Sequence, residues 1–470
     1  MQLIKAFRYT LPTSVAFVGA GGKTTAIFKA ARELLKVTRE DQKAKTILVT
    51  TTTHIGAWQA EQADHFQIIN SHSDITKFNK DLPGGVVLLT GNKNNNLLSG
   101  LPSRLLEIVR VFAEEHQYPL LIEADGSRSC PLKAPADHEP AIPNFTQCVV
   151  VVAGLQGLGK PLTNNWVHRP VKYAALSGLQ PGEEITAYAL GKVLLDKGGG
   201  LKNIPPNARR IALLNQADTP ELQAAAKTIS EMLIPDYHSV IVATLSGEST
   251  RLAVIGARRT ESTAEIHVVN EQIAGIILAA GESSRFGEPK QLLLWKGEPL
   301  IWHVAKSALS AGLSPVIVVV GSSAAEIESV IKDLPLRIVT NSIWNTGLSS
   351  SIKAGVAALP MGVGGAVFLQ ADQPQIPPTL IKSLIEAHKT TLNPIVAPQI
   401  DDQRGNPVLF DACTFTKLLA LEGDVGGRML FGQFQVQWVT WHDSKLLMDI
   451  DSPEDYRKFL ETFSEGEVEV

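Results

Sequence analysis

Two glycine-containing loops in this chain of 470 residues carry positive charges at spacings that suit the phosphates of a nucleotide. In the second half, residues 276–291 run from an apolar segment into a loop with Gly281, Arg285, Gly287 and Lys290. The glycines allow the backbone to approach a ligand closely, so main-chain N–H groups can point at phosphate oxygens. Arg285 offers phosphate a planar fork, and Lys290 offers a compact charge that can follow a phosphoryl group during transfer. The spacing predicts a triphosphate-binding loop, to which a solvated Gly-rich turn is the simpler alternative.

Acidic residues follow other segments of the same half. The apolar run 366–369 predicts a strand that ends just before Asp372, where a carboxylate can hold Mg²⁺ against a triphosphate. Residues 448–455 add Asp449 and Asp451 ahead of a helical segment. One acid can cap that helix while the other reaches the metal, and the sequence leaves open which does which.

The loop and its strand closely resemble the L-A-A-G-x-x-x-R-x-G-x-x-K signature of the molybdenum-cofactor cytidylyltransferase (MocA-like) family, and the resemblance covers residues 272–460. It implies a Rossmann-like nucleotidyltransferase domain of the GT-A-like kind, with Mg²⁺, CTP as substrate and molybdopterin cofactor as acceptor. Relatives that use guanylyl groups read Leu-Ala-Gly-Gly here, so Ala280 favours cytidine. The implied catalytic residues are Arg285, Lys290 and Asp372. The implied nucleotide-binding residues are Leu278, Ala279, Ala280, Gly281, Gly287, Asn341 and Ser350.

Three further segments carry this resemblance. Residues 341–355 match the family's N-x-x-W-x-x-G-x-x-x-S-x-x-A-G segment, whose serines and helix N-terminus suit a nucleotide, although such a loop can also simply cap a helix. Residues 404–410 match R-G-[HN]-P-V-L-F, and residues 423–428 match G-D-x-G-A-R with Gly427 in place of Ala. In relatives these two loops surround the pterin-bearing acceptor, and in the family residues 449–455 carry the second metal ligand. The implied acceptor-binding residues are Arg404, Gly405, Asn406, Asp424 and Arg428.

The implied reaction depends on positioning more than on proton transfer. The acceptor would be the phosphate monoester of molybdopterin, which is already anionic at neutral pH and needs no general base. Mg²⁺ on Asp372, with Lys290 and Arg285 on the triphosphate, would support in-line attack at the α-phosphorus and loss of pyrophosphate. A sugar or alditol phosphate is an alternative acceptor, because the fold alone does not exclude it.

The first half contains the other glycine loop. Residues 18–25 (V-G-A-G-G-K-T-T) follow an apolar run and precede a helix-like stretch. In a P-loop the backbone amides and the helix N-terminus cradle phosphates, the lysine bridges them and the next hydroxyl reaches Mg²⁺. Phe17 stands where the G-x-x-x-x-G-K-[ST] pattern has its first glycine, so a plain phosphate-binding turn is the alternative. The residues expected to bind nucleotide are Gly19, Gly21, Gly22, Lys23, Thr24 and Thr25, with Thr24 also at a metal.

Polar residues at other predicted strand ends indicate the same site. Residues 50–54 (T-T-T-T-H) supply hydroxyls that can meet a metal or phosphate. Residues 120–126 resemble a Walker-B-type strand that ends in a Mg²⁺ carboxylate, either Asp125 or Glu123. Residues 213–218 resemble the N-K-x-D guanine-reading motif with Gln216 in place of Lys, so Asn215 and Asp218 are candidates to read a purine. ATP or GTP is the nucleotide expected here.

This half also resembles one family, the selenium-dependent molybdenum hydroxylase accessory proteins (YqeC-like), over most of residues 5–255. The segments that carry this resemblance are 19–25, 50–54, 123–128, 131–140, 154–161, 167–170 and 199–205. It implies a domain that handles the cofactor before insertion, with a molybdenum hydroxylase apo-enzyme as partner. The basic residues expected to form an anion pocket are Arg128, Lys133, His138, His168 and Arg169.

Composition excludes several other classes of protein. Hydrophobic content of 44% and charged content of 19% are those of an ordinary globular protein. A net charge of −4 without a long basic run argues against a nucleic-acid partner. We find no apolar stretch of the roughly 18 residues that would span a membrane, and no signal-peptide pattern. Three scattered cysteines without C-x-x-C spacing suit a reducing cytosol, so we expect a cytoplasmic protein.

The pattern of apolar runs predicts an α/β protein with two doubly wound domains. A P-loop-like domain is expected over residues 1–265 and the nucleotidyltransferase domain over 270–470, with the boundary near residue 268 in the polar segment 258–272. The predicted strands are 15–18, 46–50, 86–89, 120–122, 148–152, 211–214, 240–243, 273–278, 315–320, 366–369 and 395–397.

The two halves together favour an enzyme of molybdenum-cofactor maturation, in which CMP transfer is coupled to a nucleotide-binding accessory domain. The alternative from a different class is a cofactor-binding chaperone for molybdenum hydroxylases, whose nucleotide sites would regulate docking. Lys290 and Asp372 favour turnover in the second half.

Overall fold

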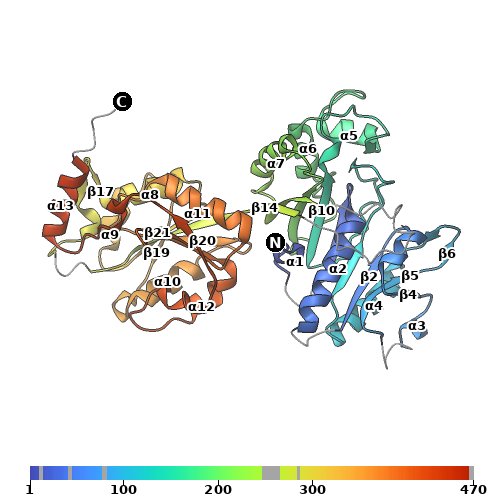
Figure 1. Ribbon diagram of the computed structural model, residues 1–470, viewed down its shortest axis with the longest axis horizontal. Coiled ribbons are helices and arrows are strands. Elements are labelled where there is room, and N and C mark those ends of the chain that lie inside the picture. Colours follow the sequence, from blue (N-terminus) through green and yellow to red (C-terminus); the bar gives the residue numbers. More distant parts are fainter. Residues whose placement is uncertain (10–13, 41–44, 77–81, 246–264, 283–285, 465–470) are drawn as a thin grey trace. The chain divides into compact units, whose positions relative to one another are not determined.

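The computed structural model describes residues 1–9, 14–40, 45–76, 82–245, 265–282 and 286–464 (Figure 1). The chain forms two compact units, Met1–Asn270 and Glu271–Val470. Each unit is built around its own sheet, and helices cover the sheet. The class is mixed α/β with parallel sheets, as the alternation of apolar runs and helical segments predicted.

The first unit contains a sheet of nine strands in the order β14-β13-β12-β10-β1-β8-β2-β5-β4. Their bounds are β1 Ser14–Gly19, β2 Thr46–Thr51, β4 His65–Ile68, β5 Gly85–Thr90, β8 Leu120–Glu123, β10 Cys148–Gly154, β12 Arg209–Asn215, β13 Ser239–Thr244 and β14 Glu265–Glu271. Neighbouring strands from β13 to β4 run parallel. Because β1, β8 and β10 are adjacent, the loops after them meet at one edge of the sheet.

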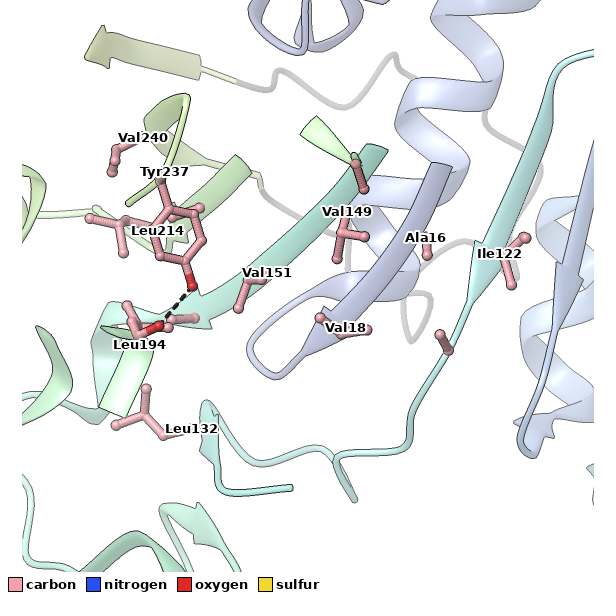
Figure 2. Packing of buried hydrophobic residues seen from close by; sticks show 14 of the residues in the cluster. Ala16, Val18, Ile122, Leu132, Val149, Val151, Leu194, Leu214, Tyr237 and Val240 are labelled. Atoms are coloured by element: carbon pink, nitrogen blue, oxygen red, sulfur yellow. Dashed lines mark hydrogen bonds between the residues drawn. The ribbon is translucent and has the colours of Figure 1, made fainter. Parts of the chain in front are cut away.

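The helices of this unit pack on both faces of the sheet. They are α1 Leu3–Ala6, α2 Lys23–Glu40, α3 His72–Thr76, α4 Ser103–Glu115, α5 Pro170–Ser177, α6 Ala187–Leu195 and α7 Pro220–Leu233. Helix α2 packs on β1, β2, β5 and β8. Successive strand residues face opposite ways, and Ala16 and Val18 join the core that contains α4, α6 and α7. Figure 2 shows this core, where the Tyr237 hydroxyl donates to the Leu194 carbonyl at 2.8 Å.

Short elements complete the first unit. Strands β3 Ile55–Gly56, β6 Lys93–Asn94 and β7 Leu97–Leu98 form one small sheet, and β9 Leu132–Lys133 pairs with β11 Val167–His168. The 3₁₀ helices are η1 Ala57–Gln62 and η3 Leu155–Gly157.

The second unit has a mixed sheet in the order β19-β18-β15-β20-β23-β21-β22, with β24 beside β21. The bounds are β15 Ile273–Ala279, β18 Val316–Val320, β19 Arg337–Thr340, β20 Gly365–Gln370, β21 Ile395–Ile400, β22 Gln403–Arg404, β23 Val408–Asp411 and β24 Val436–Thr440; β16 Leu294–Trp295 and β17 Glu298–Pro299 form a separate pair. Strands β15, β18, β19 and β20 are parallel, whereas β23 is antiparallel to both of its neighbours.

Besides a small cluster of Leu300, Ile450 and Phe459, two large apolar clusters lie in this unit. One contains side chains of α8 Leu300–Ser310, α9 Ala324–Ile331 and α11 Pro378–Thr391. The other contains side chains of α10 Leu348–Ala357, α12 Phe415–Leu419 and η7 Gly427–Leu430. The remaining elements are α13 Pro453–Ser464, η4 Lys290–Leu292, η5 Trp344–Thr346, η6 Ala412–Thr414 and η8 Ser444–Leu447.

The sheets differ from the sequence expectation at two places. Residues 404–410 were expected as an acceptor loop, but the end of this segment forms strand β23, and the short connection from β21 through β22 lets it return antiparallel. Part of the polar segment expected to link the domains is the edge strand β14, where His267 Nε2 lies 3.0 Å from the Thr244 hydroxyl. Among the described residues no helix is long and apolar enough to cross a membrane.

The first glycine loop depends on Gly19, whose φ is +96° and whose added Cβ would lie 2.1 Å from the Val152 carbonyl oxygen. We predict that Gly19→Ala lowers the free energy of unfolding by roughly 2–4 kcal/mol, because it combines left-handed strain with a backbone clash. Urea denaturation followed by circular dichroism measures the change. The control is Gly126→Ala, since an added methyl meets nothing within 4 Å there. Equal effects of the two substitutions would contradict the prediction.

Candidate functional site

Lys290 joins the acidic residues predicted for the second unit. Its ammonium group ion-pairs with Asp372, just after β20, and lies 3.2 Å from Asp451 Oδ1. It also donates to the Ile450 carbonyl at 3.3 Å. Burial by itself lowers the pKa of Lys290, but the two carboxylates outweigh it and raise the pKa, so the side chain stays charged. Residues from three separate motifs therefore meet at one point.

Two buried glutamines that the sequence analysis did not assign hold the segment with Asp449. Gln373 Nε2 donates to Asp449 Oδ1 at 2.7 Å, and Gln375 Nε2 donates to the Met448 carbonyl at 2.7 Å. The Oε1 atoms of both glutamines are buried and have no hydrogen-bond partner in the described part of the chain. Both follow Asp372 in the Q-A-D-Q-P-Q stretch, so their position next to a predicted ligand was the signal available in the sequence.

The two candidate acids of the last motif have different surroundings. Asp451 pairs with Lys290, and its N–H donates to Asp455 Oδ2 at 3.3 Å. The start of α13 is capped by Ser452, whose hydroxyl accepts from the Asp455 N–H at 3.2 Å. Asp449 is held only by Gln373 among the contacts of the described residues. Asp449 therefore has no cationic partner among the described residues, and which of the two acids joins Asp372 at a metal stays a prediction.

The donors around Asp372 are hard oxygen atoms. No group of three or more His, Cys, Asp and Glu side chains suited to a metal occurs in the described ranges. Mg²⁺ is usually held by one or two carboxylates together with substrate phosphates and water. The carboxylate of Asp372, together with that of Asp449 or Asp451, has the chemistry of such a site, and the metal stays a prediction.

The loop above Asp372 is tied to the strand end. Leu278 of β15 pairs in register with Gln370 of β20, and the Ala371 N–H donates to the Leu278 carbonyl at 3.2 Å. Gln291 Nε2 donates to the carbonyls of Gly281 at 3.1 Å and Ala279 at 3.4 Å. Ala280 follows β15, and Gly287 has a φ of +73°. Arg285 lies outside the described residues, so its role stays a prediction.

The serines after β19 bind protein groups. Asn341 Nδ2 donates to the hydroxyls of Ser350 at 2.8 Å and Ser351 at 3.1 Å. Asp424 Oδ1 accepts from the first N–H of α10, that of Leu348, at 3.0 Å. These contacts match the capping alternative, and nucleotide contacts of Asn341 and Ser350 stay predictions. Asp424 holds a helix end, which the resemblance did not indicate.

Two arginines mark the predicted acceptor loops. The Arg404 guanidinium lies 4.9 Å from the centre of the Phe431 ring, and burial together with the nearby Arg428 lowers the pKa of Arg404. Neither arginine makes an ion pair with any described residue. Gly405 and Asn406 follow Arg404, and the Gly405 N–H donates to the Pro398 carbonyl at 3.0 Å. An arginine over an aromatic ring, with a second arginine near enough to lower its pKa, suits an anionic ligand with a flat body.

In the first unit, Lys23 and Asp125 meet beneath the glycine loop. Lys23 Nζ donates to the Gly19 carbonyl at 2.7 Å and lies 3.2 Å from Asp125 Oδ1. Asp125 Oδ2 accepts from the Gly19 N–H at 2.9 Å and from Lys133 Nζ at 2.8 Å. Both side chains of the Lys23–Asp125 pair are 2% exposed. The other predicted loop residues surround this pair at the start of α2, namely Gly21, Gly22, Thr24 and Thr25.

A second carboxylate lies beside Thr24. The Thr24 hydroxyl donates to Glu123 Oε2 at 3.1 Å and accepts from Gln59 Nε2 at 2.8 Å. Burial raises the pKa of Glu123 in spite of the nearby Lys23. The hydroxyls of Thr52 and Thr53, at the end of β2, are buried and lack a hydrogen-bond partner among the described residues. This cluster therefore holds buried hydroxyl groups that the described protein groups leave unsatisfied, and its role at a metal or phosphate stays a prediction.

The two residues predicted to read a purine, Asn215 and Asp218, make contacts with different parts of the first unit. Asn215 Nδ2 donates to the Gly21 carbonyl at 2.7 Å, and its Oδ1 accepts from the Leu245 N–H at 2.9 Å. Asn215 thus fixes the glycine loop to the neighbouring strand ends. Asp218 is exposed and accepts from Gln156 Nε2 at 2.8 Å. A role of either residue in base recognition stays a prediction.

The expected anion pocket contains an acidic residue, Glu139, among the basic residues that the sequence predicted. Lys133 Nζ lies 2.9 Å from Glu139 Oε2, and Arg169 makes two hydrogen bonds of 2.8 Å to the same carboxylate. Their charges are therefore already paired. Burial and the neighbouring Arg169 lower the pKa of His168, while Arg128 and His138 are exposed.

Comparisons with known proteins match each unit to a different family. Residues 275–438 match the MobA-like NTP transferase domain, and residues 15–171 match the YqeC protein family. The uncharacterised protein YqeC of Escherichia coli K12 is 32% identical over 231 residues, which are 48% of this chain and 82% of that protein. The purine catabolism protein PucB of Bacillus subtilis 168 is 31% identical over 203 residues, which are 39% of this chain and 94% of that protein. The crystal structure of Rv0371c from Mycobacterium tuberculosis H37Rv is 28% identical, covers 40% of this chain and 98% of its own, and aligns with a TM-score of 0.37.

The second unit is a nucleotidyltransferase domain, since its matched family and its loop of glycines and lysine agree. The chain belongs to the YqeC family through its first unit and to the MobA-like NTP transferase family through its second.

The contact between Gln373 and Asp449 makes a testable prediction about metal use. Gln373→Leu keeps the size of the side chain but removes the donor, so we expect the Mg²⁺ concentration for half-maximal pyrophosphate release to rise about tenfold. The maximal rate at saturating Mg²⁺ should change less. Asp449→Asn should raise the Mg²⁺ requirement more than Asp451→Asn does. An unchanged requirement in Gln373→Leu, or the reverse order of the two aspartates, would show that Gln373 does not orient a ligand.

Glu139 should make stability depend on pH. Burial alone would raise its pKa, but hydrogen bonds from Arg169 and Lys133 lower the pKa to about 2. The contribution is complete above the ordinary glutamate pKa near 4.5 and is lost as the pH falls from there towards 2. Glu139→Gln should therefore cost roughly 3 kcal/mol at pH 7 and progressively less below pH 4.5. Urea denaturation at pH 7, 5 and 3.5 tests this, with the exposed Glu115→Gln as control; a pH-independent difference would refute it.

Proposed function

We propose that the second unit transfers CMP from CTP to molybdopterin cofactor and releases pyrophosphate, in a reaction that depends on Mg²⁺. The first unit would act as a P-loop-like nucleotide-binding accessory domain in the same maturation pathway. The observation that carries the proposal is the contact of Lys290 with Asp372 directly below the glycine loop of an NTP transferase domain.

The charges of this site suit nucleotidyl transfer. Bound Mg²⁺ would neutralise the acids and the triphosphate and polarise the reacting phosphorus. Lys290, which pairs with Asp372 and Asp451 in the structure, would then direct its charge to the phosphates. An oxygen of the acceptor phosphate forms the new bond to the α-phosphorus while the bond to the β-phosphate breaks, and pyrophosphate leaves. The acceptor phosphate is already ionised, so no protein group has to remove a proton.

The residues of the predicted acceptor loops favour an acceptor that carries negative charge and an aromatic ring system. Arg404 and Arg428 lack acidic partners among the described residues and can bind the acceptor phosphate. Phe431 below Arg404 offers an aromatic surface to a ring system. A sugar or alditol phosphate would use the arginines but would gain less from this ring.

For the first unit, Lys23 and Thr24 support a role in binding ATP or GTP. Asp125 already accepts from Gly19 and Lys133 and pairs with Lys23, whereas the carboxylate of Glu123 accepts a hydrogen bond only from Thr24 among the described residues. Of the two carboxylates that the sequence left open, Glu123 is therefore the better metal partner for Thr24. A molybdenum hydroxylase in the cytoplasm is the proposed recipient of the product. The competing role, a cofactor chaperone without turnover, rests on this buried nucleotide site alone.

The decisive measurement is pyrophosphate release by the full chain with Mg²⁺ and molybdopterin cofactor, comparing CTP, GTP, ATP and UTP. We expect release with CTP, and a loss of at least a hundredfold in Asp372→Asn, because the metal loses a charged ligand. Asp333→Asn, an exposed acid of the same unit, is the matched control.

Preference for GTP would overturn the assignment of cytidine to Ala280. Release with a sugar phosphate but not with molybdopterin would replace the acceptor. Absence of release with every nucleotide, when the cofactor is shown to bind, would favour the chaperone.

A further inference from the structure

The loop that carries Arg428 is fastened to the first turn of α10. Asp424 Oδ1 accepts a hydrogen bond from the Leu348 N–H at 3.0 Å, and the Gly423 carbonyl accepts one from the Ser349 hydroxyl at 2.6 Å. Ser349 is buried, so water does not readily replace its hydrogen bond. The loop follows α12, which packs beside α10 (Figure 1). Two hydrogen bonds therefore join the helix and the loop at one place.

Asp424 supplies the cap that α10 lacks at its own N-terminus. The N-cap residue of α10 is Gly347, which has no side chain to accept from the first N–H groups. Its φ is +114°, and a Cβ added to it would lie 2.7 Å from the N and Cα atoms of Asp424. Glycine at this position therefore lets the loop come close enough for the carboxylate to reach the Leu348 N–H.

Arg428 lies between two fixed points of the chain. On one side Asp424 holds the loop to α10, and on the other side Leu430, which is 1% exposed, anchors it in the apolar cluster of α10 and α12. Arg428 is close enough to Arg404 for its charge to lower the pKa of Arg404. Two like charges repel, so they stay together only where the backbone that carries them is held.

Arg404 lies at the same edge of the sheet as Asp372. Strands β20 and β21 both pair with Leu409 of β23, which places Gln370 and Gln399 at the same level. Gln370 ends β20 just before Asp372, and Arg404 pairs with Gln399. An anion held by the arginine pair would therefore face the edge where the predicted metal and triphosphate bind.

We propose that Asp424 is a positioning residue for the acceptor: it caps α10 and thereby holds Arg428 beside Arg404, where the pair binds an anion. The inference rests on the proposed function, in which the two arginines bind the acceptor phosphate. Asp424 acts through Arg428 and does not touch the acceptor, since a carboxylate would repel a phosphate. This role differs from the direct acceptor contact that the resemblance implied for Asp424.

Exchange of the capping atom separates this role from a direct contact. Asp424→Ala removes the acceptor of the Leu348 N–H, whereas Asp424→Asn keeps an oxygen there, and asparagine caps helices as well as aspartate does. In pyrophosphate release at saturating CTP, we expect the KM for molybdopterin cofactor to rise about tenfold in Asp424→Ala and to stay within about twofold in Asp424→Asn. The maximal rate and the KM for CTP should stay within about twofold in both. Glu422→Ala, which changes an exposed acid of the same loop, is the matched control.

Trypsin cleavage tests the position of Arg428 without any transfer reaction. Cleavage after Arg428 in the folded full chain requires local opening of this segment. We expect this cleavage to be about tenfold faster in Asp424→Ala than in the wild type, and unchanged in Asp424→Asn. Cleavage after Lys382 in α11 reports unfolding of the whole unit and should change much less. Ser349→Ala removes the second hydrogen bond of the loop and should act in the same direction if Asp424→Ala does not fold.

Three outcomes would overturn the proposal. If Asp424→Asn weakens the acceptor as much as Asp424→Ala does, the charge of Asp424 matters and not its hydrogen bond. If cleavage after Arg428 is unchanged in Asp424→Ala, other contacts hold the loop. If the acceptor KM is unchanged in Asp424→Ala, the position of the loop does not set acceptor affinity. Absence of pyrophosphate release in the wild type would refute the proposed function, and cleavage after Arg428 would then decide whether Asp424 holds the loop.

Discussion

A lysine paired with an aspartate that follows the neighbouring strand is the interaction on which both candidate sites depend. In the first unit Lys23 follows β1 and pairs with Asp125, which follows the adjacent β8. In the second unit Lys290 follows β15 and pairs with Asp372, which follows the adjacent β20. A charge removed from water requires such a partner, so each glycine loop can fold only against the next strand end. The pairing sets the predicted phosphate-binding cation and the predicted metal-binding acid of each unit side by side.

The lysine–aspartate pairs of the two units differ in solvent exposure, and this difference favours different roles for the two units. Lys23 and Asp125 are each 2% exposed, whereas Lys290 and Asp372 are 21% and 19% exposed. Exchanging Lys290 from carboxylate to phosphate needs little movement of the surrounding chain, and a catalyst must repeat that exchange in every cycle. Lys23 is enclosed with Lys133 and Glu139 in one charge network, which suits slow binding and release better than turnover.

The sequence predicted the central strands because parallel strands buried on both faces read as continuous apolar runs. It also predicted Lys290, Asp372 and Asp451 as one site, since each follows a strand or opens a helix in a recognisable motif. It did not predict the role of Gln373, nor that Asp424 caps α10, because those contacts join residues 76 positions apart in each case. Edge strand β14 was not predicted for a related reason. Its polar, alternating sequence is typical of a linker, and it forms a strand because it pairs with β13.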